Sequence, residues 1–295
     1  MQKIDEFINK YLIDLDYEPI LTMLSNLNSG KKLRSKLILA IAGQSNEAYK
    51  LCACVELIHL ASLLHDDIID ESILRRGARS VNAQFGTKNA LMLGDILYSK
   101  AFFELSKTKF SSIISEAVAN LAIGELMDVN LSSEFNENKE QYLKMIYYKT
   151  AVLIEASARC GAILAGFDEL KFAMYGKNLG LAFQMIDDIL DIKSDEKTLG
   201  KPAFSDFKEG KTTLPYIYLY ENLSENDKAK LKSLFKKELN ESEKEWIKDK
   251  FQSTNSLQKA VLEAKNYANL ALSSIDKFEN LKLNEIANSM INREF

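Results

Sequence analysis

Hydrophobic and polar residues follow a helical period along nearly the whole chain. Apolar residues recur at intervals of three and four positions, which places them on one face of an α-helix. The strict alternation that marks a half-buried strand is essentially absent. The pattern predicts helices over residues 2–14, 33–46, 48–73, 88–107, 111–131, 138–164, 168–193, 212–221, 225–237, 241–251, 254–276 and 281–292.

The longest break in this pattern lies at residues 194–211. It contains Gly200, Pro202 and Gly210, and it is rich in lysine. A lysine-rich loop directly after an acidic helix end is typical of a lid over a bound anion. The chain elsewhere has no linker or repeat, and 46% of its residues are hydrophobic. We therefore predict an all-α protein, a single domain over residues 1–295 that forms a helical bundle around a deep central cavity.

Two groups of aspartates interrupt the apolar pattern. In the first, Asp66 and Asp70 are four residues apart, so both carboxylates leave the same face of a helix. In the second, residues 183–191 read FQMIDDILD, and Asp187 and Asp191 have the same spacing. Because a buried carboxylate without a partner is costly, two such groups indicate two acidic helices that face each other across shared metal ions. Mg²⁺ suits this arrangement, since it binds a few carboxylates together with water and substrate phosphates.

Four motifs lie between residues 30 and 215 and include both aspartate groups. They are GKKLRS at 30–35, DDIID at 66–70 with RRG at 75–77, FQMIDDILD at 183–191, and GKPAFSDFKEGKTTLP at 200–215. In order and spacing they resemble the signatures of the trans-isoprenyl diphosphate synthases, or polyprenyl synthetases, and especially the long-chain octaprenyl and heptaprenyl diphosphate synthases. Ser35 departs from the family pattern, which has proline there. We expect this departure to affect the backbone after Arg34 but not the cations of the motif.

The resemblance implies the isoprenoid synthase fold and a set of site residues. The expected Mg²⁺ ligands are Asp66, Asp70 and Asp187, which form the catalytic set together with Lys201. The cations and hydroxyl expected at the allylic diphosphate belong to Arg75, Lys149, Thr150 and Lys211, and Gln184 is also expected to bind substrate. The residues expected to bind isopentenyl diphosphate are Lys31, Arg34, His59 and Arg76.

This set of residues predicts the reaction. An allylic diphosphate must lose pyrophosphate to leave a carbocation, so the leaving group has to be neutralised before the C–O bond breaks. The double bond of isopentenyl diphosphate then attacks the cation, and we expect the departing pyrophosphate to take the proton. An apolar wall excludes water that would quench the cation.

Two other classes of protein remain open. A non-catalytic subunit of a heteromeric prenyl synthase would share the fold, but such subunits usually lack the aspartates that this chain keeps. A terpene cyclase or a head-to-head condensing enzyme is a third possibility. Lys31, Arg34 and Arg76 argue against a cyclase, because they provide a site for a second diphosphate.

The residues before the first aspartate motif predict the length of the product. We expect the growing tail to run back along the helix, past Ala61 and Ser62, about 6 Å from Asp66. Short-chain members of the family often carry a bulky aromatic residue there, whereas both residues here are small. We therefore expect a long all-trans polyprenyl diphosphate for a quinone side chain, with a farnesyl or geranylgeranyl diphosphate synthase as the alternative. Four large apolar residues are expected in the core, and Phe102 or Met127 could also form the tunnel floor: Phe102, Phe103, Leu126 and Met127.

Charge and cysteine content set limits on partners and location. The net charge of −4 argues against nucleic acid as a partner. Cys52 and Cys54 point to different faces of a helix and Cys160 is distant, which fits a reducing cytosol. The N-terminus lacks the apolar core of a signal peptide, and no uncharged run approaches the length of a transmembrane segment. We therefore expect a cytoplasmic protein, and the family resemblance implies a homodimer.

Overall fold

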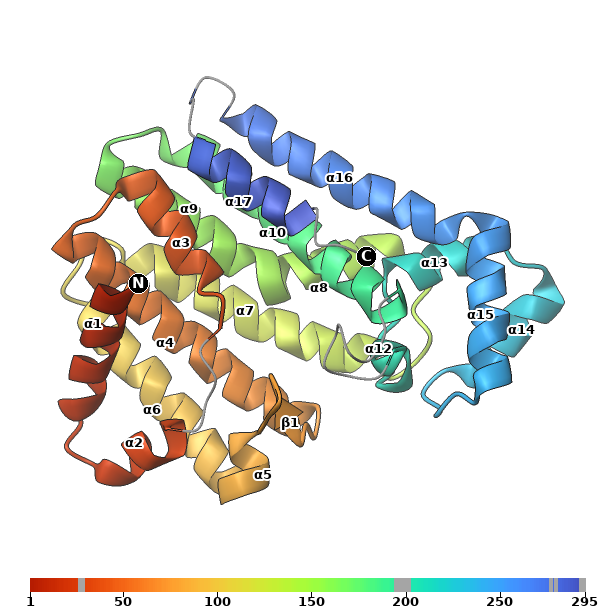
Figure 1. Ribbon diagram of the computed structural model, residues 1–295, viewed down its shortest axis with the longest axis horizontal. Helices are drawn as coiled ribbons and strands as arrows, with labels where there is room; N and C mark the ends of the chain where they lie inside the picture. The colour runs from red at the N-terminus through yellow and green to blue at the C-terminus, as the bar shows by residue number, and fades with distance from the viewer. Residues whose placement is uncertain (26–29, 194–202, 276–277, 279–280, 292–295) are drawn as a thin grey trace. The chain divides into compact units, whose positions relative to one another are not determined.

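The computed structural model describes residues 1–25, 30–193, 203–275, 278 and 281–291 of the 295-residue chain. These residues are helical over most of their length, so the predicted all-α fold class is confirmed (Figure 1). The chain divides into two compact units. Unit 1 consists of Met1–Val118 and Ala156–Ala173, and unit 2 consists of Ala119–Glu155 and Met174–Phe295. The single domain over 1–295 and its central cavity stay predictions.

The helices of unit 1 come mainly from the first third of the chain. They are α1 (Gln2–Ile13), α2 (Glu18–Leu24), α3 (Leu33–Ala42), α4 (Asn46–Ile69), α5 (Val81–Phe85) and α6 (Thr87–Leu105). Three further helices contribute residues to both units: α7 (Ser111–Leu131), α9 (Val152–Ala165) and α10 (Glu169–Lys193).

The remaining elements belong to unit 2. They are α8 (Lys139–Ile146), the π-helical turn η1 (Tyr147–Ala151), α12 (Ser205–Lys208), α13 (Leu214–Glu221), α14 (Glu225–Leu234), α15 (Glu241–Thr254), α16 (Ser256–Ser274) and α17 (Leu281–Ile291). Most of the predicted helices are therefore confirmed to within a few residues. The predicted helix over 138–164 is wrong in one respect, because the turn η1 interrupts it.

Helix α4 is the central element of unit 1. Its N-cap Ser45 accepts a hydrogen bond from the backbone N–H of Ala48 at 3.1 Å, which satisfies one of the donors that a helix start leaves unpaired. The helix packs against α1, α3, α5 and α6, and it lies alongside α6 (Figure 1). It ends at Ile69, earlier than the predicted residue 73, because Glu71 has a left-handed φ of 50° that a helix cannot continue through.

A two-stranded hairpin follows α4, which the sequence pattern did not predict. Strands β1 (Leu74–Arg75) and β2 (Ala78–Arg79) pair antiparallel, with Arg75 opposite Ala78. The two residues between them, Arg76 and Gly77, have φ of 53° and 78°. Positive φ at both central positions is the requirement of the tight turn that matches the twist of two strands. The RRG motif therefore places Arg75 on β1 and forms the turn of the hairpin with Arg76 and Gly77.

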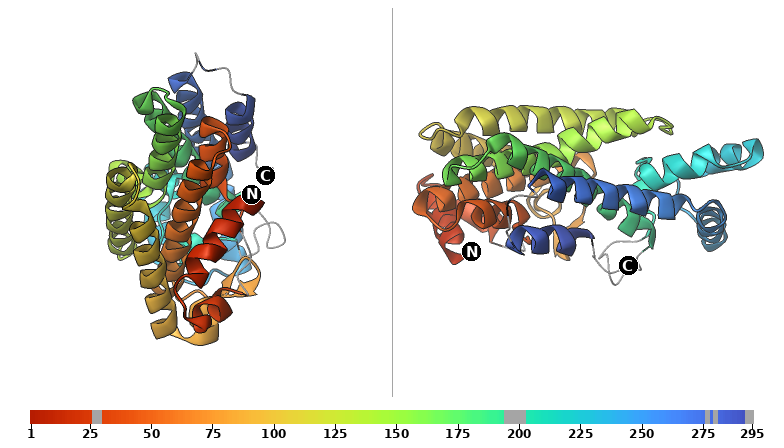
Figure 2. Two further views of the ribbon diagram at one scale, coloured as in Figure 1. Left: turned by 90° about the vertical axis from the view of Figure 1, so that its left-hand side faces the viewer. Right: turned by 90° about the horizontal axis from the view of Figure 1, so that it is seen from above.

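The core of unit 2 contains two neighbouring clusters. In the first, residues of α8, α10, α13 and α16 pack together around the fully buried Met185 and Leu214. In the second, Phe207 stacks on Tyr216 with ring centroids 4.4 Å apart, and the ring of Phe251 meets Tyr216 edge-on. Helices α16 and α17, the blue helices of Figure 2, lie side by side. This packing supports α10, which carries the second aspartate motif.

The expectation that four large residues of α6 and α7 belong to the core is only partly right. Phe102 and Met127 are half-buried, but the side chains of Phe103 and Leu126 are exposed by 58% and 61%. Both helices carry apolar residues on more than one face, so the apolar pattern alone could not show which face is buried. The outer faces also expose other apolar residues: Leu91, Met92, Ile123 and Val129.

The three cysteines are buried and form no disulfide, as expected for residues that the pattern placed apart. Burial raises the pKa of each thiol to about 12. In the described part of the chain, every helix is either too short or too polar to cross a bilayer.

Candidate active site

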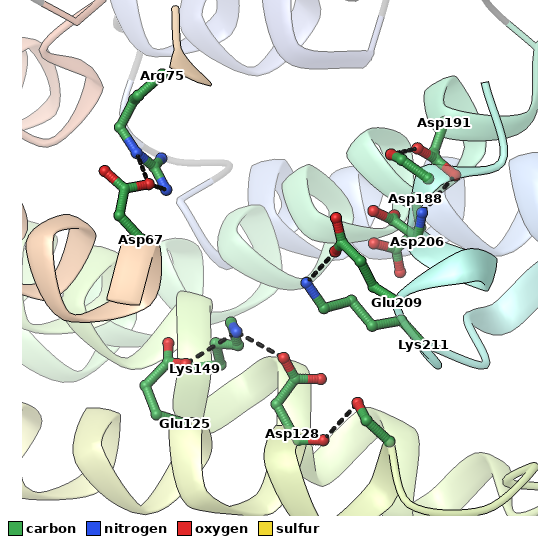
Figure 3. Close-up of polar contacts among 12 residues, drawn as sticks. Asp67, Arg75, Glu125, Asp128, Lys149, Asp188, Asp191, Asp206, Glu209 and Lys211 are labelled. Atoms are coloured by element: carbon green, nitrogen blue, oxygen red, sulfur yellow. Dashed lines mark hydrogen bonds and ion pairs between the residues drawn. The ribbon is translucent and has the colours of Figure 1, made fainter. Parts of the chain in front are cut away.

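The end of α4 carries three aspartates in two different environments. Asp67 is only 2% exposed, and the Nε and Nη2 atoms of Arg75 each lie 2.6 Å from its Oδ1 (Figure 3). Burial raises the pKa of Asp67, although the Arg75 guanidinium opposes this shift. Asp66 and Asp70 are half-buried, and the backbone N–H of Asp70 donates to the Asp66 carbonyl at 2.8 Å. Asp67 thus fastens the hairpin to the helix, while Asp66 and Asp70 stand one helical turn apart.

A positively charged cluster lies in the same unit. Burial lowers the pKa of His59 well below its ordinary value, and Arg34, Arg76 and Arg75 lower it further. Burial also lowers the pKa of Arg34, to about 10. The Nε–H of Arg34 is buried and has no hydrogen-bond partner among the described residues. A neutral imidazole among three guanidinium groups, one of them with an unsatisfied donor, is an environment that an anion would stabilise.

Gly30 brings the first motif against this cluster. A Cβ atom at Gly30 would lie 2.5 Å from Nη1 of Arg76, so a larger residue at this position would require the guanidinium to shift. The structure therefore brings together Arg34, His59 and Arg76, three of the four residues expected at isopentenyl diphosphate. The fourth, Lys31, is exposed and follows Gly30 directly in the chain.

In unit 2, the turn η1 carries the lysine–threonine pair. Lys149 donates to Glu125 Oε2 at 2.9 Å and to Asp128 Oδ2 at 2.6 Å (Figure 3). The hydroxyl of Thr150 donates to Oε1 of Gln184 at 2.7 Å. A π-helical turn inside an α-helix is rare and frequently marks a functional site. Here it directs the two side chains toward α7 and α10.

Two glycines allow these helices to approach the turn. A Cβ atom at Gly124 of α7 would overlap the backbone of Tyr148 and Lys149. A Cβ atom at Gly180 of α10 would lie 2.5 Å from the Cα of Ala151. The backbone of η1 is thus held between two glycine contacts, and the residues that bind Lys149 and Thr150 follow each glycine on its own helix.

The second aspartate motif also divides into buried and half-buried groups. Asp188 accepts hydrogen bonds from Tyr142 Oη at 2.5 Å and from Gln184 Nε2 at 2.9 Å. Asp191 accepts from the Ser205 hydroxyl at 2.6 Å and from the Asp206 backbone N–H at 3.2 Å (Figure 3). Both carboxylates are buried, and burial with the neighbouring Asp206 charge raises the pKa of Asp188 to about 8. Asp187, the expected metal ligand, is half-buried.

Of the two lysines expected after α10, only Lys211 is among the described residues. Lys201 lies outside the described residues. Lys211 donates to Glu209 Oε2 at 2.7 Å, and it lines a small recess with Asp128, Tyr142 and Thr213. Because Asp128 also binds Lys149, two of the cations expected at the allylic diphosphate lie near one acidic side chain in unit 2.

Comparison with known proteins identifies the family. Residues 18–253 match the family model of the polyprenyl synthetases. The chain belongs to this family. The predicted resemblance is confirmed, and with it the assignment as an enzyme of the trans-prenyltransferase class.

Relatives of this polyprenyl synthetase make products of different lengths, according to their names. The structure is similar to that of octaprenyl pyrophosphate synthase from Helicobacter pylori, with a TM-score of 0.94 and 44% identity over 99% of this chain and 98% of that chain. A short chain isoprenyl diphosphate synthase of Methanothermobacter thermautotrophicus is 38% identical over 246 residues, 78% of this chain and 76% of that protein. A geranylgeranyl diphosphate synthase of Saccharolobus solfataricus is 37% identical over 264 residues, 83% of this chain and 79% of that protein. These relatives do not decide between long and short products.

Sequence reasoning missed several residues that hold the site of this polyprenyl synthetase together. Glu125 and Asp128 bind Lys149, and Gly124 and Gly180 flank the π-helical turn. A signal for them was present, since an aspartate and two glycines inside apolar helices each need a local reason. Within the ranges that the structure describes, no group of three or more Asp, Glu, His or Cys residues is arranged to hold a metal ion.

Proposed function

We propose that this polyprenyl synthetase condenses isopentenyl diphosphate with an allylic diphosphate, head to tail and with Mg²⁺. The observation that carries the proposal is the cluster of Arg34, His59 and Arg76 in unit 1. The cluster is rich in donors for an anion and lies apart in sequence from the lysines of unit 2. An enzyme that ionises one diphosphate and holds a second one needs two such sites, whereas a cyclase needs only one.

The cluster has the chemistry of a diphosphate site. Arg34 and Arg76 offer planar forks of N–H donors that match phosphate oxygens. His59 is neutral near pH 7 because its pKa is depressed, so it can donate one hydrogen bond without adding charge. The second substrate needs firm binding but no activation, since its diphosphate is not the leaving group. Lys31, which follows Gly30 in the chain and is exposed, is assigned to the same diphosphate.

Asp66, Asp70 and Asp187 have the chemistry of Mg²⁺ ligands. All three are half-buried, whereas the neighbouring Asp67, Asp188 and Asp191 are buried. Hard carboxylate oxygens, with places left for water and phosphate, are what Mg²⁺ prefers. When bound, Mg²⁺ would neutralise charge on the departing diphosphate.

The allylic diphosphate is assigned to the lysines and hydroxyl of unit 2. Glu125 and Asp128 hold the Lys149 ammonium in a fixed place, which reduces the cost of ordering it when substrate binds. Thr150 and Gln184 are joined by a hydrogen bond and continue to Asp188. We also assign Lys211 and Lys201 to the allylic diphosphate, where they would add positive charge. Positioned cations of this kind stabilise the developing charge of pyrophosphate.

We assign a long-chain product, as for the octaprenyl synthase that this chain resembles. Ala61 and Ser62 lie on α4 before Asp66, and both are small and buried. The Ser62 hydroxyl donates back to the carbonyl of His59 at 2.9 Å, so its polar atom is satisfied within the helix. An alkyl chain could therefore pass these two residues without meeting an unpaired polar group.

We also propose a homodimer. Helix α6 exposes Leu91, Met92 and Phe103, and α7 exposes Ile123, Leu126 and Val129. Contiguous exposed apolar patches mark protein–protein interaction sites, and we propose that the apolar side chains of each helix contribute to such a site. Sedimentation of the purified protein at several concentrations measures whether the chain is a dimer.

The test of the proposed function is product analysis by mass spectrometry. The purified protein is incubated with isopentenyl diphosphate, isotopically labelled farnesyl diphosphate and Mg²⁺, with a matched sample in excess EDTA. The proposal expects a labelled long-chain polyprenyl diphosphate only in the sample with Mg²⁺. Products that stop at the geranylgeranyl stage would favour the short-chain alternative, and no product would favour a non-catalytic subunit.

A further inference from the structure

Ser35 occupies a position where the family pattern has proline, and it makes contacts that proline cannot. Its side chain is fully buried, and its hydroxyl donates to Oε1 of Glu56 at 2.6 Å. Its backbone N–H approaches the same oxygen at 3.4 Å. Proline has neither donor. The contact between α3 and the Glu56 carboxylate therefore depends on the residue that this chain has in place of proline.

Glu56 serves as the cap of α3. The helix begins at Leu33, and its N-cap Lys32 has a left-handed φ of 48° and provides no side-chain cap. Ser35 is the third residue of the helix, so its N–H is one of the donors that the first turn leaves without a helical acceptor. A carboxylate at this end also interacts favourably with the helix dipole. The Glu56 side chain is thus held on α3 by two donors of Ser35.

Glu56 also acts on the positively charged cluster, and it precedes His59 by three residues on α4. Among the charges that act on Arg34, Glu56 has the largest effect and opposes the lowering of its pKa by burial. It acts in the same direction on Arg76. An acidic side chain whose charge acts on two guanidinium groups is a potential competitor for a diphosphate. Yet its hydrogen bonds go to Ser35, and the Nε–H of Arg34 has no hydrogen-bond partner within the described part of the chain.

We propose that Ser35 is a positioning residue for the second substrate: it holds the Glu56 carboxylate on α3, so that Arg34 stays available to a diphosphate. The proposal rests on the proposed function, because it takes isopentenyl diphosphate as the ligand of Arg34. Without the Ser35 hydroxyl, Glu56 would gain more by pairing with Arg34, since a carboxylate and a guanidinium form strong, bidentate hydrogen bonds. The diphosphate would then have to displace an internal partner.

The test is a double-mutant cycle read out as KM. Ser35→Ala should raise the KM for isopentenyl diphosphate roughly 3- to 10-fold, a part of the value of a hydrogen bond to a charged group. The kcat and the KM for the allylic substrate should change less than about 2-fold, since neither involves Arg34. Ser35→Thr, which keeps a hydroxyl, should restore most of the affinity. In a Glu56→Gln background Ser35→Ala should have almost no effect, because an uncharged amide pairs weakly with Arg34.

The Glu56→Asp variant and the activity of the wild-type protein separate failure of this inference from failure of the proposed function. If Ser35→Ala does not fold, Glu56→Asp replaces it, because the shorter side chain keeps the charge but loses its reach to Ser35, and a similar rise in KM is expected. Absence of condensation by the wild-type protein would overturn the proposed function and this inference with it. Condensation by wild type, with an unchanged KM in Ser35→Ala or an equal rise in both Glu56 backgrounds, would overturn the inference alone.

Discussion

Neighbouring aspartates in each motif have different surroundings. Asp67 is buried against Arg75, and Asp191 is buried against Ser205 and the start of α12. Asp66 and Asp187 are half-buried in their two units. The spacing of the carboxylates could be predicted from the sequence, because helical geometry fixes it. Which of two adjacent carboxylates is buried depends on the packing of other elements, which no local pattern contains.

The difference between half-buried and buried aspartates predicts that some variants lose turnover and others lose stability. Asp66→Ala or Asp187→Ala should reduce kcat by about 10³-fold or more with unchanged circular dichroism, since each would remove stabilisation of the leaving group. Asp191→Ala should instead lower thermal stability, because it removes the acceptor of the half-buried Ser205 hydroxyl and of the Asp206 N–H, at a cost of about 1 kcal/mol. Steady-state kinetics and thermal unfolding of all three variants separate the two roles. An Asp187→Ala enzyme within a few-fold of wild type would remove that residue from the metal site.

The charge state of His59 is a second prediction at the scale of the residue. The chain has only two histidines, so selective labelling gives two resonances in NMR. Burial and the three arginines depress the pKa of His59, so its resonance should show no protonation step near the ordinary value of about 6.5. Inorganic pyrophosphate should raise that pKa, because bound negative charge offsets the arginines. A normal titration that is insensitive to pyrophosphate would contradict the proposed anion site.

The sign of this shift also gives an expectation for stability. The unfolded chain takes up a proton at His59 below about pH 6.5, and the folded chain does not. The contribution of this residue to the stability of the folded state is thus present above that pH and is lost as the pH falls. His59→Gln should therefore flatten the acid side of the stability profile measured by urea unfolding.

At the scale of the element, the long helices were predictable, whereas the short helices α2, α5 and α12 and the interruptions of the long helices were not. The apolar period sets the helix spans to within a few residues. The turn η1 requires one additional residue per turn, and its sequence YYKTA contains neither proline nor glycine to mark it. The contacts that select it lie far away in sequence, at Gly124 and Gly180. The hairpin was missed for a related reason, because Arg76 adopts a left-handed φ that is unusual for arginine.

The glycine contacts predict that η1 is sensitive to a single methyl group. Gly180→Ala should raise the KM for the allylic substrate several-fold and lower the melting temperature, since the added Cβ would push the backbone at Ala151. Gly161→Ala is the matched control, because a Cβ atom there meets Ile41 at 3.2 Å, a contact that a small shift relieves. Alanine normally favours a helix over glycine, so a loss specific to Gly180 isolates the contact with η1. Equal effects of both changes on both substrates would show that η1 has no particular role.

At the scale of the whole molecule, the family was predictable and the product length was not. Four ordered motifs carry the family signal, and each consists of residues whose chemistry the reaction needs. Product length depends on the size of the apolar side chains along the path of the growing alkyl chain. Many different sequences give a path of the same length. Relatives with names that denote both short and long products fit this chain at similar identity.

Steric filling provides the prediction for product length. Ala61→Phe should shorten the main product to about the farnesyl or geranylgeranyl stage, because the ring would fill the path along α4 without touching the metal ligands. Ala53→Ser, further along the same helix, is a control with little change in volume. Chromatography of the dephosphorylated products measures the chain length. Unchanged products in Ala61→Phe would mean that the alkyl chain takes another path.

The proposed reaction requires two separate groups of cations, one for each diphosphate. The most direct measurement is the KM of each substrate, with the other saturating, for Arg76→Ala and Lys149→Ala. Arg76→Ala should raise the KM for isopentenyl diphosphate by at least about 10-fold and leave the allylic KM nearly unchanged, and Lys149→Ala should do the reverse. Equal changes in both constants for both variants would contradict the assignment of two sites.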